Sequence, residues 1–246
     1  MHLIVHQVTI INGQNCNPMT DANFEQIENL KWLPWIGDRF NSLALDNRLL
    51  IVEESHYHDN TPASIEKHNS PTFTRKIVEE LAIERWYYGT KIFPNLHRAL
   101  FRNDEFDSPT FWSLVSFYNF IQRPMDTNKG RPSYDDFYNG WFPFLEIISL
   151  LKPKTCLFIG TSAANSLGHA LQSTDFYTDG VKWEDYISKA YAKTAVIKDK
   201  GGNETQLIFI RHTSQMFSWS KWNDYLQKKM HSELTWFDEQ LKNVTT

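Results

Sequence analysis

The stretch LLIVEESHYH, residues 49–58, decides the fold class. Its first four residues form a continuous apolar run, which is typical of a strand buried on both faces of a parallel sheet. The six residues after them are polar or aromatic, so the carboxyl end of this strand opens into a polar loop. Ligands of open parallel sheets bind at the carboxyl ends of the strands. Residues 49–58 therefore predict an α/β fold with a functional site beside this strand.

Further apolar runs predict three more buried strands, over Leu114 to Phe120, in TCLFIG (155–160) and in QLIFI (206–210). Helical patterns alternate with them, beginning at the capping residues Thr20 and Ser70, at Phe93, over Ser133 to Leu151, and over Trp219 to Leu241. Each parallel connection needs a crossover helix. We therefore expect one domain over residues 1–246, a three-layer α/β/α sandwich with a mainly parallel, four-stranded central sheet. The polar stretch 174–203 predicts a decorated connection with at most a short fifth strand over Thr194 to Ile197.

Composition is typical of a globular intracellular protein. Of 246 residues, 41% are hydrophobic and 22% charged, and 25 Lys and Arg against 29 Asp and Glu leave a net charge of −4. This balance argues against a general cationic coat but allows a local basic groove. Cys16 and Cys156 are too few for a disulfide framework or an iron–sulfur cluster. No apolar run approaches the length of a membrane span and the amino end lacks a secretion signal, so we expect a cytoplasmic protein without a membrane partner.

Polar clusters follow three of the predicted strands, at 53–58, 117–120 and 211–214. Acid, amide and imidazole groups at three strand ends predict one shared cleft. The alternative is structural: Glu54 caps a helix, Asn119 satisfies a buried backbone group and His212 is a packed histidine. Any single cluster is more often structural, but the three together favour a site.

Five segments in order resemble the uracil-DNA glycosylase superfamily, in its divergent branch with a Gly-Glu-Ser-His-Tyr-like first motif. LLIVEESHYH is similar to that first motif, and LPWIGDRF (33–40) to an opening segment of the same branch. VSFYNFIQ (115–122) resembles the strand whose asparagine reads the base edge. CLFIGTSAANSL (156–167) resembles a strand-Gly-x-x-Ala-helix unit, with Gly160 and Ala164, and RHTSQMF (211–217) resembles a His-Pro-Ser motif.

Three departures from that pattern argue against uracil as the substrate. Glu53 stands where the branch has glycine, Ser55 where the best-known uracil enzymes have aspartate, and Thr213 where the last motif has proline. The cysteines of the iron–sulfur branches are also absent. We therefore expect no cofactor and no metal.

The resemblance implies roles for particular residues. The residues expected to be catalytic are Glu54, Ser55 and His212: Glu54 would stabilise the sugar cation or orient water, and His212 would donate to the leaving base. One residue of register error at the strand end would exchange Glu54 for Glu53. The residues expected to contact the base are Asn119, Tyr57, His56 and Trp35. The residues expected to contact DNA are Ser162, Ser214, Arg123 and Arg131 at phosphates and Met216 and Phe217 as an apolar wedge; a solvated charged loop and ordinary packing explain the basic and apolar residues equally well.

The leading hypothesis is a DNA glycosylase-like hydrolase that acts on a flipped-out modified or damaged pyrimidine, in DNA repair or in defence against phage with modified DNA. One alternative is a catalytically inactive nucleic-acid-binding module on the same fold. Another is a hydrolase of free nucleosides or nucleotides. A steep loss of affinity with salt would separate the DNA binders from the last class.

Overall fold

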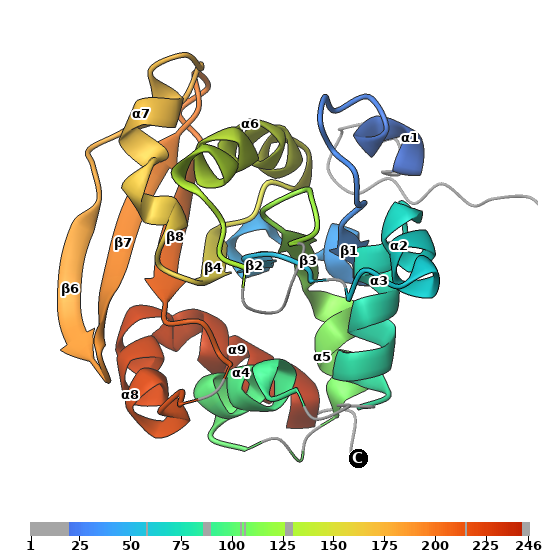
Figure 1. The fold of residues 1–246 in the computed structure, drawn as a ribbon. Helices are drawn as coiled ribbons and strands as arrows, with labels where there is room; N and C mark the ends of the chain where they lie inside the picture. Colours follow the sequence, from blue (N-terminus) through green and yellow to red (C-terminus); the bar gives the residue numbers. More distant parts are fainter. Residues whose placement is uncertain are drawn as a thin grey trace, which may run out of the picture.

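A central eight-stranded sheet organises the computed structural model, which describes residues 20–57, 59–85, 90–103, 105, 107–125, 130–214 and 216–242 (Figure 1). The strand order is β1-β3-β2-β4-β8-β7-β5, and β6 pairs with β7. The strands are β1 (Trp35–Ile36), β2 (Leu49–Glu53), β3 (Ser116–Asn119), β4 (Thr155–Ile159), β5 (Tyr177–Thr178), β6 (Lys182–Ile187), β7 (Ala190–Lys198) and β8 (Glu204–Ile210).

The four strands predicted from apolar runs form the parallel centre of this sheet, in the order β3, β2, β4, β8. The α/β class is thus confirmed, whereas a mainly parallel, four-stranded sheet is wrong, because the sheet is mixed and has eight strands. Strand β1 pairs antiparallel with β3 at one edge, and β7 pairs antiparallel with β8 at the other. Residues 174–203, expected to hold at most one short strand, contain β5, β6 and β7. Half-exposed antiparallel strands lack the continuous apolar run by which buried parallel strands are recognised.

Helices cover both faces of the sheet (Figure 1). One buried cluster joins α6 and α7 to the sheet, and a second joins η3, α4, α5, α8 and α9 to the opposite face. The helices are α1 (Asp21–Phe24), η1 (Phe40–Ser42), η2 (Leu45–Asn47), α2 (Pro62–Asn69), α3 (Phe73–Ile77), η3 (Val78–Ile83), α4 (Ile92–Phe101), α5 (Ser108–Leu114), α6 (Tyr134–Leu151), η4 (Ala163–Asn165), α7 (Leu167–Leu171), α8 (Trp219–Lys229) and α9 (His231–Lys242).

Local sequence explains the helix bounds. Ser133 caps α6 as predicted, and its side chain and that of Asp136 form a reciprocal capping box. The single helix expected over Trp219 to Leu241 is instead two helices, because the chain leaves the helical conformation at Met230, which is completely buried. The helix expected from Ser70 begins at Phe73 and continues as the π-helical segment η3. No helix in the described ranges has the length and apolar character needed to cross a membrane.

Candidate active site at the carboxyl edge of the sheet

Parallel pairing brings the three polar motifs to one edge of the sheet. Glu53, the last residue of β2, is the register partner of Asn119 in β3 and of Ile159 in β4. Ile159 in turn pairs with Ile210, the last residue of β8, and His212 lies two residues further on. Because parallel strands share their direction, the loops after all four strands emerge at this edge.

The two glutamates of the first motif leave β2 on opposite sides. Leu50 and Val52 belong to the core under α6, whereas Leu49 and Ile51 belong to the core under α4 and α5. Strand alternation therefore directs the Glu53 side chain toward the α4 side and the Glu54 side chain, just beyond the strand, toward the α6 side; both residues border a cavity at the end of β2. Glu54 is half-buried and Glu53 is buried.

The Glu54 carboxylate packs against the backbone of Gly160, the residue after β4. A Cβ atom added at Gly160 would lie 2.7 Å from Glu54 Oε2, and Gly160 has φ +143°, a conformation that side chains disfavour. The adjoining cavity measures about 10 Å³ and is bounded by Glu54, Gly160 and Phe137 among others. That volume accommodates at most about one water molecule. Glycine at this position thus lets a carboxylate approach a water-sized space.

Burial controls the charge of both carboxyl groups. Desolvation raises the pKa of Glu54 to about 7, although the positive charge of Arg131 opposes this shift. Desolvation and then the neighbouring Glu54 charge raise the pKa of Glu53 to about 8. At neutral pH the pair therefore carries less than two negative charges, and Glu54 ionises first.

His212 is held as a neutral hydrogen-bond donor. Burial, with a smaller contribution from the Arg131 charge, lowers its pKa to about 4. The backbone N–H of Ser214 donates to His212 Nδ1 at 3.3 Å. Since Nδ1 accepts, the proton of the neutral ring is on Nε2. The positive charge of Arg131 lowers the pKa of both Glu54 and His212.

Asn95 of α4 holds the loop that carries His212, a role that the motif search does not identify. Its side-chain amide donates to the carbonyl oxygens of Thr213 at 2.7 Å and Ser214 at 3.1 Å. Asn95 is buried within a helix whose other buried positions are mostly apolar. The sequence signal that could have identified Asn95 is the presence of a polar residue on the apolar face of a helix.

The Asn119 carboxamide is completely buried at the end of β3, and neither its oxygen nor its nitrogen has a hydrogen-bond partner in the described part of the chain. Ser55 Oγ and Thr213 Oγ1 are also buried without a hydrogen-bond partner among the described residues. A buried polar group without a partner costs about 1–3 kcal/mol. Asn119 therefore keeps its full capacity to donate and accept hydrogen bonds.

Of the residues expected at the base or the DNA, His56 and Phe217 are buried and Trp35 is half-buried. His56 packs edge-on against Trp32 and Phe73, and its Nε2 is 3.1 Å from Thr74 Oγ1. The Trp35 indole donates to the Trp112 carbonyl at 2.9 Å, beside the middle of β3. Phe217 is buried and stacks on Trp222 with 6.1 Å between ring centroids. Packing and hydrogen bonding in the core account for all three.

Other predicted DNA contacts differ in availability. Met216 is 84% exposed at the tip of the loop after His212, with φ 59°. Arg123 binds both carboxylate oxygens of Asp136, at 2.6 and 2.7 Å. Its guanidinium is therefore already bound to a side chain of the capping box of α6. Arg131 is exposed and makes one backbone hydrogen bond, to Gly130.

The remaining predicted residues lie close to the edge. Tyr57 is half-buried against the α6-side core and forms a parallel bridge with Met125. Ser162 is half-buried and directly precedes η4, in the loop that begins at Gly160. Ser214 contributes its backbone N–H to His212, as described above.

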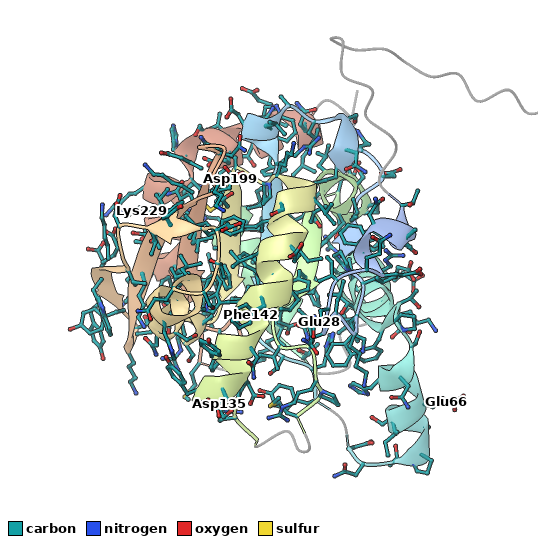
Figure 2. The ribbon with its side chains drawn as sticks, turned by 90° about the horizontal axis from the view of Figure 1, so that it is seen from above. Glu28, Glu66, Asp135, Phe142, Asp199 and Lys229 are labelled. Carbon is teal, nitrogen blue, oxygen red and sulfur yellow. The ribbon has the colours of Figure 1, made fainter. Side chains whose placement is uncertain are left out.

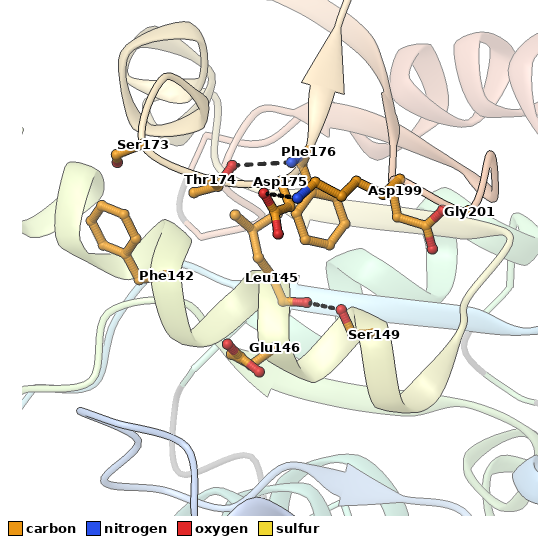
Figure 3. Close-up of a pocket in the computed structure, with 11 residues that line it drawn as sticks. Phe142, Leu145, Glu146, Ser149, Ser173, Thr174, Asp175, Phe176, Asp199 and Gly201 are labelled. Carbon is orange, nitrogen blue, oxygen red and sulfur yellow. Dashed lines mark hydrogen bonds and ion pairs between the residues drawn. The ribbon is translucent and has the colours of Figure 1, made fainter.

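A cavity of about 590 Å³ lies at the other end of the molecule (Figure 3). It is bounded by α6 and by the turn between β7 and β8, which precedes β8 and so belongs to the amino edge of the parallel strands. In Figure 2, Asp135 at the start of α6 and Asp199 in that turn lie toward opposite ends of the protein, with Phe142 between them. Lys200 and Asp175 form an ion pair at 2.7 Å beside this cavity. Its carboxylates are remote from Glu54 and His212.

Among the described residues, no group of three or more His, Cys, Asp and Glu side chains could hold a metal ion. Cys156 is buried in β4, and Cys16 lies outside the described residues. No protein-family model and no curated protein matches this sequence.

Proposed function

We propose that this protein is a DNA glycosylase-like hydrolase that cleaves the N-glycosidic bond of a flipped-out modified or damaged pyrimidine, with a uracil-DNA glycosylase-like fold. The observation that carries the proposal is that Glu54 and His212 follow parallel strands that end at the same edge of the sheet, with the charge of Arg131 acting on both. A carboxylate and a neutral imidazole donor are the two groups that this bond cleavage requires.

In the proposed reaction, the bond between C1′ and the base nitrogen breaks, and its electron pair leaves with the base. Water forms the new bond to C1′ and gives a proton to the Glu54 carboxylate, which passes it on to solvent. The Nε2–H of His212 donates to the base oxygen on which negative charge develops. The cavity beside Glu54 holds about one water molecule, so we assign it to the attacking water and not to the base.

Recognition would use the edge of β3 and the exposed loop after β8. Asn119 pairs in register with Glu53 and shares its side of the sheet; at the strand end its buried amide would offer a donor and an acceptor to a pyrimidine edge. Met216 projects from the loop after His212 and would fill the space that a flipped nucleotide leaves in a duplex. Arg131 would contact the backbone phosphates. Its positive charge would also favour the ionised form of Glu54 and the neutral form of His212.

Purified protein incubated with single- and double-stranded DNA carrying different modified bases tests the proposal. The panel includes uracil, deaminated purines, and hydroxymethylated and glucosylated cytosines, with abasic sites scored by alkaline cleavage, and free nucleosides as a separate arm. We expect abasic sites from at least one pyrimidine, lost in Glu54→Gln and His212→Ala. Cleavage of free nucleosides alone would contradict the proposal. Salt-sensitive DNA binding without any product would do the same and favour an inactive module.

A further inference from the structure

The β6–β7 hairpin exposes three aromatic side chains that pack on each other. Trp183 and Tyr186 are each 63% exposed and Tyr191 is 46% exposed. The Tyr191 ring lies 5.2 Å from that of Trp183 and 4.8 Å from that of Tyr186 between centroids. We call these three residues the aromatic platform. The hairpin forms the outer edge of the sheet, beyond β8 (Figure 1).

A register shift in β6 places the platform on one face. Trp183 pairs with Lys193, and Tyr186 pairs with Tyr191. Lys193 and Tyr191 are two residues apart in β7 and therefore share a face, whereas Trp183 and Tyr186 are three apart and in a regular strand would not. The irregularity between them restores the common face. The hairpin thus presents all three rings together to solvent.

A buried cation lies beneath this platform. Lys193 is 4% exposed, and its Nζ is 4.4 Å from the centroid of the Trp183 ring. The ammonium donates to the Thr161 carbonyl at 3.1 Å and to Asn165 Oδ1 at 2.8 Å. No carboxylate of the described residues forms an ion pair with it. The nearest acid of β6, Glu184, binds Lys229 and Thr194 instead. The platform therefore has at its base a lysine ammonium that is hydrogen-bonded but, among the described residues, not ion-paired.

The platform is continuous with the candidate active site at two points. Thr161, which accepts from Lys193, follows Gly160, the residue that the Glu54 carboxylate contacts. Arg211, next to His212, donates to the carbonyl of Ser188 in the β6–β7 turn at 3.0 Å. A chain bound at Glu54 and His212 would thus reach the rings across the loops after β4 and β8.

We infer that the aromatic platform binds the bases of a single-stranded DNA segment that flanks the nucleotide held at Glu54 and His212; this inference rests on the proposed function. Exposed aromatic rings beside a cation stack on unpaired bases of any sequence and attract the backbone. The faces of bases inside a duplex are covered by their neighbours, so the platform favours single strands. An exposed Trp and two exposed Tyr fit flat rings better than an irregular protein surface.

Binding of a fluorescent oligothymidine without any modified base, measured by anisotropy over a salt series, tests the inference. Stacking on an aromatic side chain changes affinity by about 5- to 150-fold per base. We expect Trp183→Ala and Tyr191→Ala each to weaken binding by about fivefold or more, and Trp183→Phe to retain most of it. Tyr177→Ala is the matched control, because Tyr177 is 59% exposed but lies on β5, outside the platform. Unchanged thermal midpoints would show that all variants fold.

Unchanged affinity in the platform variants would overturn the inference. It would also be overturned by a dimer, detected by sedimentation, that Trp183→Ala dissociates, since the rings would then contact a second copy. The binding assay does not require cleavage of any base. The platform and the glycosylase activity can therefore be contradicted independently of each other. Loss of oligothymidine binding in Trp183→Ala supports the platform even if no substrate yields abasic sites. Abasic sites without any effect of Trp183→Ala on binding support the glycosylase and overturn the platform.

Discussion

The Glu54 carboxylate lies on the Cα of Gly160, so closely that a Cβ there would be 2.7 Å from Oε2. Two strands that are neighbours in the sheet, β2 and β4, create this contact by ending at the same level. A side chain at residue 160 would force the Glu54 carboxylate to move. The size of residue 160 therefore determines the position of the proposed catalytic group.

Gly160→Ala should displace the Glu54 carboxylate and lower glycosylase activity by about tenfold or more, since catalysis depends on sub-ångström placement. The φ of +143° adds strain that costs about 1–3 kcal/mol in the free energy of unfolding. Abasic-site formation and urea denaturation measure the two effects. Gly168→Ala is the control, because a Cβ there meets nothing within 4 Å. Full activity in Gly160→Ala would remove Glu54 from the mechanism.

The rate of base release should rise with pH through a midpoint near 7, because Glu54 acts as a carboxylate and burial raises its pKa to about 7. Replacing Arg131 by Met removes a positive charge that favours the ionised form, so the midpoint should move to higher pH. The pKa of His212, about 4, leaves its ring neutral throughout. Rates at saturating DNA, from pH 5.5 to 9, test this. Arg123→Met, whose guanidinium pairs with Asp136, should leave the midpoint in place.

Stability should fall as pH rises from 6.5 to 8, because Glu53, with its pKa raised to about 8, keeps in the folded protein a proton that the unfolded chain has already lost. Buried neutral histidines such as His212 have the opposite effect, but only below their unfolded pKa near 6.5. Between pH 6.5 and pH 8 the stability of Glu53→Gln relative to the wild type should therefore increase by about 1–2 kcal/mol. Denaturation at the two pH values measures this, and equal slopes for both proteins would contradict the burial of Glu53.

Asn95→Asp should destabilise the loop that carries His212. The substitution keeps the size of the side chain but replaces the amide donor with an oxygen that faces the Thr213 and Ser214 carbonyls. Loss of a buried hydrogen-bond donor costs about 1–3 kcal/mol. We expect a lower free energy of unfolding together with lower activity, and retained activity would show that α4 does not position His212.

Met216 and Phe217 are adjacent and should respond differently to alanine. Met216→Ala should leave stability unchanged, since the side chain is 84% exposed, but reduce activity on double-stranded more than on single-stranded substrate. Phe217→Ala removes a buried ring stacked on Trp222 and should cost about 3–5 kcal/mol. Equal activity of Met216→Ala on both substrates would exclude the wedge role.

Much of the architecture was predictable because it depends on local patterns. The apolar runs of β2, β3, β4 and β8 identify strands buried on both faces, and only parallel neighbours with helices above and below bury them in that way. Asn119 and His212 were expected at one edge for the same reason: they follow those strands. Residues 174–203 were not predictable, since β6 has only one buried residue and its pairing with β7 is a long-range contact.

The sequence by itself determined that polar groups follow the buried strands and emerge at one edge of the sheet. The apolar runs that mark these strands are local patterns, and parallel strands share their direction. Only the tertiary structure decided toward which side of the sheet each glutamate points, since the two differ by one residue and strand alternation sends them to opposite faces. It also decided that His56 packs in an aromatic cluster and that the charge of Arg131 acts on both Glu54 and His212. Burial and charge at those positions come from segments distant in the chain, and no local pattern specifies them.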